Sequence, residues 1–407
     1  TVAAEVFDTD ISYSNSVTWI VNVQSSNEPP NSWRISPSSS SITIIQGSSQ
    51  TFTVGASDSN GNLYGSDWYL NGNHDDTNSM SGSSDTDSWS HTFNSTGAYT
   101  VAAEVFDTDF SYSNSVTWIV NVEPIEHPDR EFFDDFTYNS YDDPNLVSFG
   151  WIVVDGVNAP PRMANYKEEN ISFSNDPDND NNMLMSLMTL TSNTFGSMEL
   201  ARIESPIIFL EGTYAARVYY DNSPENWQDG NVETLYTING LWGDPNYSEC
   251  DFEYLPWDVW VGDPYVNTMH LSTWETYQGE PWDPNYETTQ IEDNFEGWHI
   301  LVFEANNNNS VKYYIDGEFQ AEHQISNYGD TVYPETKMQI AFANWIATDE
   351  NGSGLGLSSQ QRNCSMKVDW VYHAKEVSLS TDQIESLITD FRDQSPPIPR
   401  HNSVNNC

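Results

Sequence analysis

Short segments in which apolar and polar residues alternate run through most of the chain. Residues 41–44 (Ser-Ile-Thr-Ile) and 51–54 (Thr-Phe-Thr-Val) have an apolar side chain at every second position, and residues 116–122 follow a similar pattern. This period of two is typical of half-buried strands, because successive side chains of a strand point to opposite faces. Residues 58–62 (Asp-Ser-Asn-Gly-Asn) predict a turn. Helical periodicity is almost absent before residue 380, so the pattern predicts an all-β chain.

The first residues of the chain are a second copy of a later segment. Residues 1–23 repeat residues 100–122 with one difference, Ile11 in place of Phe110. The offset of 99 residues matches the length of one immunoglobulin-like sandwich, about 100 residues. We therefore expect residues 1–27 to be the last strands of a truncated domain and residues 28–123 to be a complete copy. On this view the chain is a fragment or processed product of something longer.

The complete copy also carries a family resemblance. Gly97-Ala98-Tyr99-Thr100-Val101 and Trp118-Ile119-Val120-Asn121-Val122 resemble the G-x-Y-x-V and closing W-x-V-x-V segments of PKD domains. The resemblance implies an immunoglobulin-like sandwich that acts as a spacer or adhesive module on an extracellular protein. An adhesive role of this kind also implies that the protein associates with itself through the repeats. We find no catalytic constellation in this domain.

Three further segments follow residue 123. Residues 124–130 (Pro-Ile-Glu-His-Pro-Asp-Arg) predict a short stiff linker, and residues 131–377 are again rich in β signals. Residues 378–407 predict a short helix and a polar tail. The helix begins with a capping pattern, Ser380 followed by Gln383, and ends before Pro396. Its apolar face, expected to dock on the β domain, comprises Ile384, Leu387, Ile388 and Phe391.

Three acidic residues alternate in one predicted strand. In residues 247–255 (Tyr-Ser-Glu-Cys-Asp-Phe-Glu-Tyr-Leu), Glu249, Asp251 and Glu253 share one face and Cys250 shares the other with its apolar neighbours. Like charges this close repel, so at least one carboxyl is expected to have a raised pKa. Two Glu side chains leaning together over a sugar would bring their carboxyls to roughly 5 to 7 Å, which favours a retaining glycosidase. The alternative is an acidic strand edge, because 61 of 407 residues are Asp or Glu.

The flanking sequence resembles glycoside hydrolase family 16, whose signature is E-[aliphatic]-D-x-E on a jelly-roll strand. Six landmarks of that family occur in order: residues 133–136, 212–217, the signature at 249–253, the hairpin 297–299 with 311–317, residues 338–345, and residues 368–372. The resemblance implies a concanavalin-like β-jelly roll over residues 131–377. It also implies a double displacement in which Glu249 is the nucleophile, Glu253 the acid and base, and Asp251 the residue that tunes both.

The resemblance extends to the substrate. One residue separates Asp251 from Glu253, and this regular spacing is similar to that of mixed-linkage glucanases. A polysaccharide partner, a β-1,3-1,4-glucan or related β-glucan, is therefore expected. The resemblance marks Trp345 as a sugar-stacking residue, and we expect further substrate-binding residues at Arg217, His299, His270, Trp242 and Trp257. The alternatives are a surface ion pair for the arginine, a structural role for the two histidines, and core packing for the tryptophans.

Calcium is the one metal that the sequence suggests, and catalysis itself needs no cofactor. Asp176, Asp178 and Asp180 alternate in an Asn-rich segment, and oxygen ligands at that spacing suit calcium. A plain acidic turn explains the segment equally well, since the helix and terminal Glu of an EF-hand are missing. Family resemblance marks Asp369 as a structural calcium position on the convex side.

Charge and cysteine content limit the remaining choices. The formal net charge is −48 with 13 Lys and Arg, which argues against nucleic acid and anionic membranes as partners. The sequence has no run of 18 apolar residues, so no membrane insertion is expected. A disulfide between Cys250 and Cys364 stays open. We expect an extracellular or cell-surface protein; the alternative to the hydrolase is a carbohydrate-binding or filament protein that keeps the jelly roll without catalysis.

Overall fold

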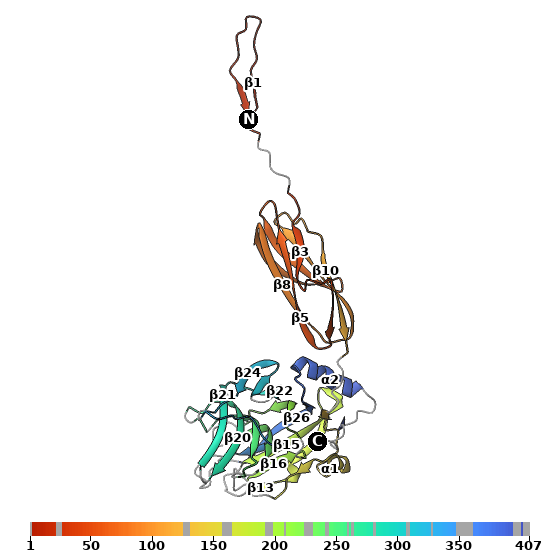
Figure 1. The fold of residues 1–407 in the computed structure, drawn as a ribbon, viewed down its shortest axis with the longest axis vertical. Helices are drawn as coiled ribbons and strands as arrows, with labels where there is room; N and C mark the ends of the chain where they lie inside the picture. The colour runs from red at the N-terminus through yellow and green to blue at the C-terminus, as the bar shows by residue number, and fades with distance from the viewer. Residues whose placement is uncertain are drawn as a thin grey trace. The chain divides into compact units, whose positions relative to one another are not determined.

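The computed structural model is built almost entirely of strands, as predicted, and divides into two compact units, Thr1–Pro124 and Ile125–Cys407 (Figure 1). It describes residues 2–21, 27–124, 131–156, 165–191, 198–206, 209–223, 231–240, 244–258, 260–261, 264–279, 282–306, 310–326, 329–346, 361–393 and 400–401, with the side chains of 180–181, 278–279, 282–283 and 400–401 left out. Most of the predicted linker lies outside these ranges. In the described part of the chain, no helix is both long and apolar enough to cross a bilayer.

The first unit contains a sandwich of two sheets. The larger sheet has the order β4 (Ser41–Ile45), β10 (Val116–Glu123), β9 (Gly97–Asp107), β6 (Leu63–Leu70) and β7 (Asn73–Gly82), and the smaller has β3 (Asn31–Ser36), β5 (Ser48–Ser57) and β8 (Ser84–Phe93). The strands predicted at 41–44, 51–54 and 116–122 lie within β4, β5 and β10. Trp68 and Trp118 stack in its core with ring centroids 6.0 Å apart, and both are fully buried. The arrangement is consistent with an immunoglobulin-like sandwich; the PKD assignment stays a prediction.

Residues 2–21 form an antiparallel hairpin of β1 (Val2–Ala4) and β2 (Val17–Trp19). Val2 pairs with Trp19 in the same register in which Val101 pairs with Trp118 in the sandwich. Every described hairpin residue is exposed, whereas Val101 and Trp118 are fully buried. The two copies of the repeat therefore share their strand pairing, but the apolar side chains of the first copy face solvent.

The second unit is a jelly roll of two packed sheets that meet along one edge, as predicted. In the sheet that we call the front sheet, all neighbours are antiparallel. Its order is β12 (Ile152–Val153), β16 (Glu199–Glu204), β25 (Gln339–Ile346), β18 (Asn231–Asn239), β19 (Ser248–Leu255), β20 (Thr268–Gly279) and β21 (Trp282–Glu292).

The other sheet, the back sheet, is built around the long strand β26 (Arg362–Lys375), which pairs with β17 on one side and with β15 and then β11 on the other. Its members are β14 (Ile171–Asp176), β15 (Asn179–Thr191), β26, β17 (Gly212–Tyr220), β22 (Gly297–Ala305), β23 (Val311–Ile315), β24 (Glu318–His323), β11 (Glu131–Asp134) and β27 (Arg400–His401). The smaller elements are β13 (Asn165–Tyr166), α1 (Pro144–Phe149) and the 3-10 turn η1 (Glu168–Asn170).

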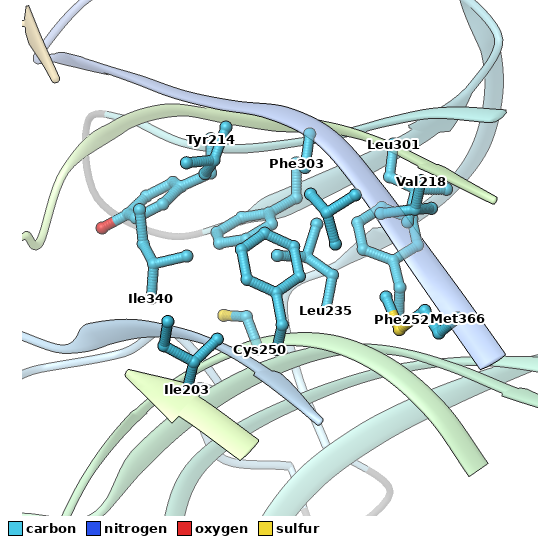
Figure 2. Close-up of a cluster of buried hydrophobic side chains, with 14 of the residues drawn as sticks. Ile203, Tyr214, Val218, Leu235, Cys250, Phe252, Leu301, Phe303, Ile340 and Met366 are labelled. Carbon is cyan, nitrogen blue, oxygen red and sulfur yellow. The ribbon is translucent and has the colours of Figure 1, made fainter. Parts of the chain in front are cut away.

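The core lies between the two sheets and fixes which side of each strand faces out. Figure 2 shows Cys250 and Phe252 of the front sheet beside Tyr214 and Phe303 of the back sheet. The rings of Tyr214 and Phe303 stack with centroids 4.3 Å apart. Cys250 therefore points into the sandwich, as predicted. It is a free, buried thiol, as is Cys364, so the two do not form the disulfide that the sequence left open.

Helix α2 (Thr381–Asp393) covers the outer face of the back sheet, and its prediction is confirmed. Its start is a capping box, because the Gln383 N–H donates to Ser380 Oγ at 3.3 Å while the Ser380 N–H donates to Gln383 Oε1 at 3.0 Å. Phe391 stacks on Phe133 of β11 at 4.6 Å. Each fully buried apolar side chain contributes about 1.5 to 3 kcal/mol, so the buried face holds the helix on the sheet.

Candidate active site

Strand β19 carries the predicted acid triplet, Glu249, Asp251 and Glu253, on regular extended backbone. Because the alternate residues Cys250 and Phe252 lie in the core, the triplet points to the outer face of the front sheet. On the β20 side, Glu249 is opposite Trp274, Asp251 is opposite Ser272 and Glu253 is opposite His270. On the β18 side, the residues opposite the three acids are Ile238, Tyr236 and Thr234, in the same order.

Glu249 is surrounded by groups that favour its ionised form. Burial raises the pKa of Glu249 to about 7, while a hydrogen bond from Tyr247, the charge of Arg202 and a hydrogen bond with Asp251 act in the opposite direction. The Tyr247 hydroxyl donates to Oε2 of Glu249. Glu249 therefore ionises near neutral pH with its donors already in place.

Asp251 lies between the two glutamates and is 4% exposed. Burial, followed by the charges of Glu249 and Glu253, holds the pKa of Asp251 well above its ordinary value. A hydrogen bond from Trp274 has a smaller, opposite effect. Asp251 therefore holds its proton more tightly than an ordinary aspartate, and its hydrogen bond with Glu249 favours the ionised form of that neighbour.

Glu253 has a different environment from Glu249. Burial, with the charges of Glu249 and Asp258, raises the pKa of Glu253 to about 8. Asp258 is fully buried, and its Oδ2 lies 2.5 Å from Nε2 of His270, the residue opposite Glu253. Both glutamates therefore hold their protons more tightly than ordinary carboxyls, and Glu249 differs from Glu253 in having hydrogen-bond partners that favour its ionised form.

Two tryptophans lie at the Glu253 end of the triplet. Trp345 on β25 donates its indole N–H to Oγ1 of Thr234 at 3.2 Å, and Thr234 is opposite Glu253. The ring of Trp260 is 5.8 Å from that of Trp345 and 5.2 Å from that of His270. Trp260 is 44% exposed. Flat aromatic faces of this kind offer apolar surface against which a sugar ring can pack.

Trp257 and Trp242 were the other tryptophans predicted to bind substrate. Trp257 is half-buried just after β19, and its backbone N–H donates to Oδ1 of Asn267 at 3.1 Å. Trp242 lies outside the described residues, so its predicted role is untested.

The structure does not bring Arg217 and His299 to the triplet. They lie on β17 and β22 of the back sheet, on the far side of the core from the front sheet's outer face. Arg217 forms an ion pair with Asp369 at 2.7 Å, and His299 Nδ1 lies 2.7 Å from Asp316 Oδ2. The prediction that these two residues bind substrate beside the acids is therefore wrong, because their strands belong to the other sheet.

Asp369 does not fit the calcium role that the resemblance implied. Its two carboxylate oxygens accept hydrogen bonds, each at 2.7 Å, from Arg217, Arg392 of α2 and Asn182. Although burial opposes it, the Arg392 charge and these hydrogen bonds keep the pKa of Asp369 below its ordinary value. Two guanidinium ions already neutralise this carboxylate and would repel a cation.

Of the alternating aspartates, Asp176 and Asp178 have side chains that the structure describes, and Asp176 is bonded as in a turn. Asp176 accepts hydrogen bonds from the Asp178 N–H at 2.9 Å and from Asn182 Nδ2 at 3.2 Å, which is the pattern of a capped turn. Asp178 is exposed, and the Asp180 side chain lies outside the described part of the chain. Within the described ranges no group of three or more His, Cys, Asp or Glu side chains is arranged for a metal ion.

Three residues of the site were not identified from the sequence, namely Tyr247, Arg202 and Asp258, and Trp260 was not singled out from its neighbours. Tyr247 carried a usable signal, because it precedes Glu249 by two positions and so shares its strand face. Trp260 was one of several tryptophans near the signature, with no local feature to single it out. The order of strands in the sheet brings Arg202 to the site, and a loop brings Asp258. Neither feature produces a periodic pattern in the sequence.

Comparison with known proteins gives a family match and several similar folds. The model for glycosyl hydrolases family 16 matches residues 164–372. A β-glucanase from Bacillus licheniformis is 17% identical, with a TM-score of 0.43, over 60% of this chain and 98% of that one. A lichenase derived from a mouse hindgut metagenome is 18% identical, with a TM-score of 0.42, over 61% and 100%. A laminarinase from Flavobacterium sp. UMI-01 is 12% identical, with a TM-score of 0.43, over 60% and 99%. No curated protein matches the chain.

Proposed function

The chain belongs to glycosyl hydrolases family 16, and from this we propose that it is a retaining endo-β-glucanase. The observation that carries the proposal is the acid triplet, in which three carboxyls on one strand face all have raised pKa values but have different partners. An acidic strand edge without function would not need the donors that surround Glu249 or the buried Asp258 beside Glu253.

The mechanism follows from these environments. Glu249, held by Tyr247 and Asp251, attacks the anomeric carbon as the bond to the leaving oxygen breaks. Glu253 gives its proton to that oxygen, and the leaving chain departs as an alcohol. Glu253, now ionised, takes a proton from water, whose oxygen displaces Glu249 from the sugar. Two inversions at the anomeric carbon give net retention.

The proposed substrate is a β-1,3-1,4-glucan or a related β-glucan. The single residue between Asp251 and Glu253 is the feature that favours this class, and the faces of Trp345 and Trp260 supply apolar surface for its rings. A polymer substrate is met outside the cell, so the proposal includes an extracellular or cell-surface location.

Release of reducing ends from barley β-glucan and from laminarin tests the proposal. We expect activity in the full chain and a loss of about a thousandfold or more in Glu249→Gln, because the amide cannot form the covalent intermediate. Glu318→Gln, an exposed carboxylate on the back sheet, is the control and should keep full activity. No release from either polymer, or unchanged release in Glu249→Gln, would contradict the proposal.

A further inference from the structure

A cavity of about 250 Å³ lies on the back-sheet side of the second unit. Val302 and Glu304 of β22 and Tyr314 of β23 line one side, and the segment that leads into α2 lines the other. Because β22 and β23 belong to the back sheet, the hydrophobic core separates this cavity from the acid triplet on the front sheet. Neither the family resemblance nor the proposed mechanism uses it.

Both sides of the cavity contribute apolar surface. Val302, which is 2% exposed, lines the sheet side, and Leu379 lines the side formed by the segment before α2. Tyr314 is half-buried, and its ring meets that of Phe319 edge to face at 5.7 Å. A half-buried ring at the edge of a cavity provides a flat surface on which a ligand with an apolar face can pack.

Both sides of the cavity also contribute polar groups. The carboxylate of Glu304 lies on the sheet side, where it accepts a hydrogen bond from Asn306 at 3.3 Å, and the hydroxyls of Ser378 and Thr381 lie on the other side. Ser378 Oγ accepts a hydrogen bond from Asn306 Nδ2 at 2.9 Å, so its own hydroxyl hydrogen remains able to donate. The lining therefore contains both acceptors and donors within reach of one small ligand.

Charge and size narrow the ligand class. Glu304 is the charged residue of the lining and disfavours an anion, while its carboxylate can accept the hydroxyl hydrogens that a neutral sugar offers. Pockets for small molecules have volumes of roughly 300 to 1,000 Å³, and a cavity slightly below this range suits one ring. A neutral pyranose has the required features, namely a flat apolar face and several hydroxyls at its edge.

We propose that this cavity is a second glycan-binding site, which holds a single neutral pyranose unit with its apolar face on Tyr314 and its hydroxyls on Glu304 and Ser378. The site performs no chemistry. It lies apart from the acid triplet, so it binds a sugar whether or not the triplet cleaves one. If the protein acts on a polymer, the second site raises the residence time of the protein on that polymer.

Binding of methyl β-D-glucopyranoside to the full chain, measured by saturation-transfer NMR titration, tests the proposal. The titration is carried out in Glu249→Gln and repeated in Glu249→Gln with Trp345→Ala, which weakens sugar stacking at the front sheet. We expect binding to persist in the double variant. Adding Glu304→Gln to it should weaken binding about tenfold or more, because a hydrogen bond to a charged group is lost, and adding Tyr314→Ala should have a similar effect.

Glu322→Gln is the matched control, since Glu322 is an exposed carboxylate opposite Lys312 on β24 and does not line the cavity. Adding it should leave binding unchanged. Glu304→Gln is nearly isosteric, so its result stands even if Tyr314→Ala lowers stability. Equal binding with and without Glu304→Gln, or no binding in the double variant, would overturn the proposal. Hydrolysis is measured separately, so a failure of the glucanase proposal does not decide this one.

Discussion

At the scale of single residues, the environment of each carboxyl decides its role. Glu249 and Glu253 lie on the same strand face, four residues apart, yet a tyrosine hydroxyl and Asp251 bind the first while a buried Asp–His pair lies beside the second. Burial raises the pKa of both, and the partners separate them, with values of about 7 and about 8. Two variants test these partners independently.

Tyr247→Phe removes a hydrogen bond that lowers the pKa of Glu249, so that pKa should rise. Glu249 must be ionised to attack, and the acidic limb of the kcat/KM profile should therefore move to higher pH. Loss of a hydrogen bond to a charged group, worth about 1.5 to 3 kcal/mol, should lower kcat/KM by about tenfold or more. Tyr286→Phe, which keeps its ring stacked on Trp274, is the control. An acidic limb that stays in place in Tyr247→Phe would argue against this role.

Asp258→Asn removes a negative charge that raises the pKa of Glu253, so that pKa should fall. Glu253 must be protonated to act as the acid, and the basic limb of the kcat/KM profile should move to lower pH. The pH dependence of β-glucan hydrolysis measures the shift. A basic limb that moves upward would contradict the assignment of Glu253 as the acid.

Glu233 supplies a stability test that does not depend on activity. It is fully buried on β18, hydrogen-bonded to Asn231 and Cys364, and burial raises its pKa to about 8. The folded state therefore holds this proton more tightly than the unfolded chain, and stability falls as the pH rises from about 4.5 to about 8. Glu233→Gln stays neutral, so its Tm should exceed that of the wild type more at pH 8 than at pH 5. A Tm difference that is the same at both pH values would exclude this effect.

At the scale of elements, the sequence pattern identified the strands and α2 but not which strands lie next to each other in a sheet. Alternation placed Glu249 and Cys250 on opposite faces of β19, and the face of α2 that contains Ile384 and Phe391 is buried as predicted. The pattern did not contain the order of strands in a sheet. Arg217 was therefore expected beside the acids, although the pairing of β17 with β26 and β22 places it in the back sheet.

The contact of α2 with the back sheet explains why Asp369 does not fit a metal. Arg392 reaches from the last turn of α2 to Asp369, which Arg217 also binds. Arg392→Gln removes a hydrogen bond to a charged group, worth about 1.5 to 3 kcal/mol, while Arg217 stays bound to Asp369, so the Tm should fall by several degrees. Asp390→Asn on the same helix is the control. A chelator should leave the wild-type Tm unchanged; a large fall on adding EDTA would contradict this account.

At the scale of the whole molecule, the scarce cations are placed where they hold the fold together. The sequence has 13 Lys and Arg against 61 Asp and Glu. In the first unit, Arg34 donates to the Thr117 carbonyl at 2.6 Å and lies 5.4 Å from the centroid of Trp118. In the second unit, Arg202 is near Glu249, and Arg217 and Arg392 meet at Asp369. These four arginines therefore make contacts within their own units.

The central claim is that Glu249 attacks the sugar and Glu253 supplies the proton, and the configuration of the first product tests it most directly. Proton NMR of barley β-glucan during early hydrolysis by the full chain distinguishes the two anomers before they equilibrate in water. The account predicts that the β-anomer appears first and that Glu249→Gln produces neither anomer. An α-anomer appearing first would show direct attack by water and would contradict the covalent role of Glu249.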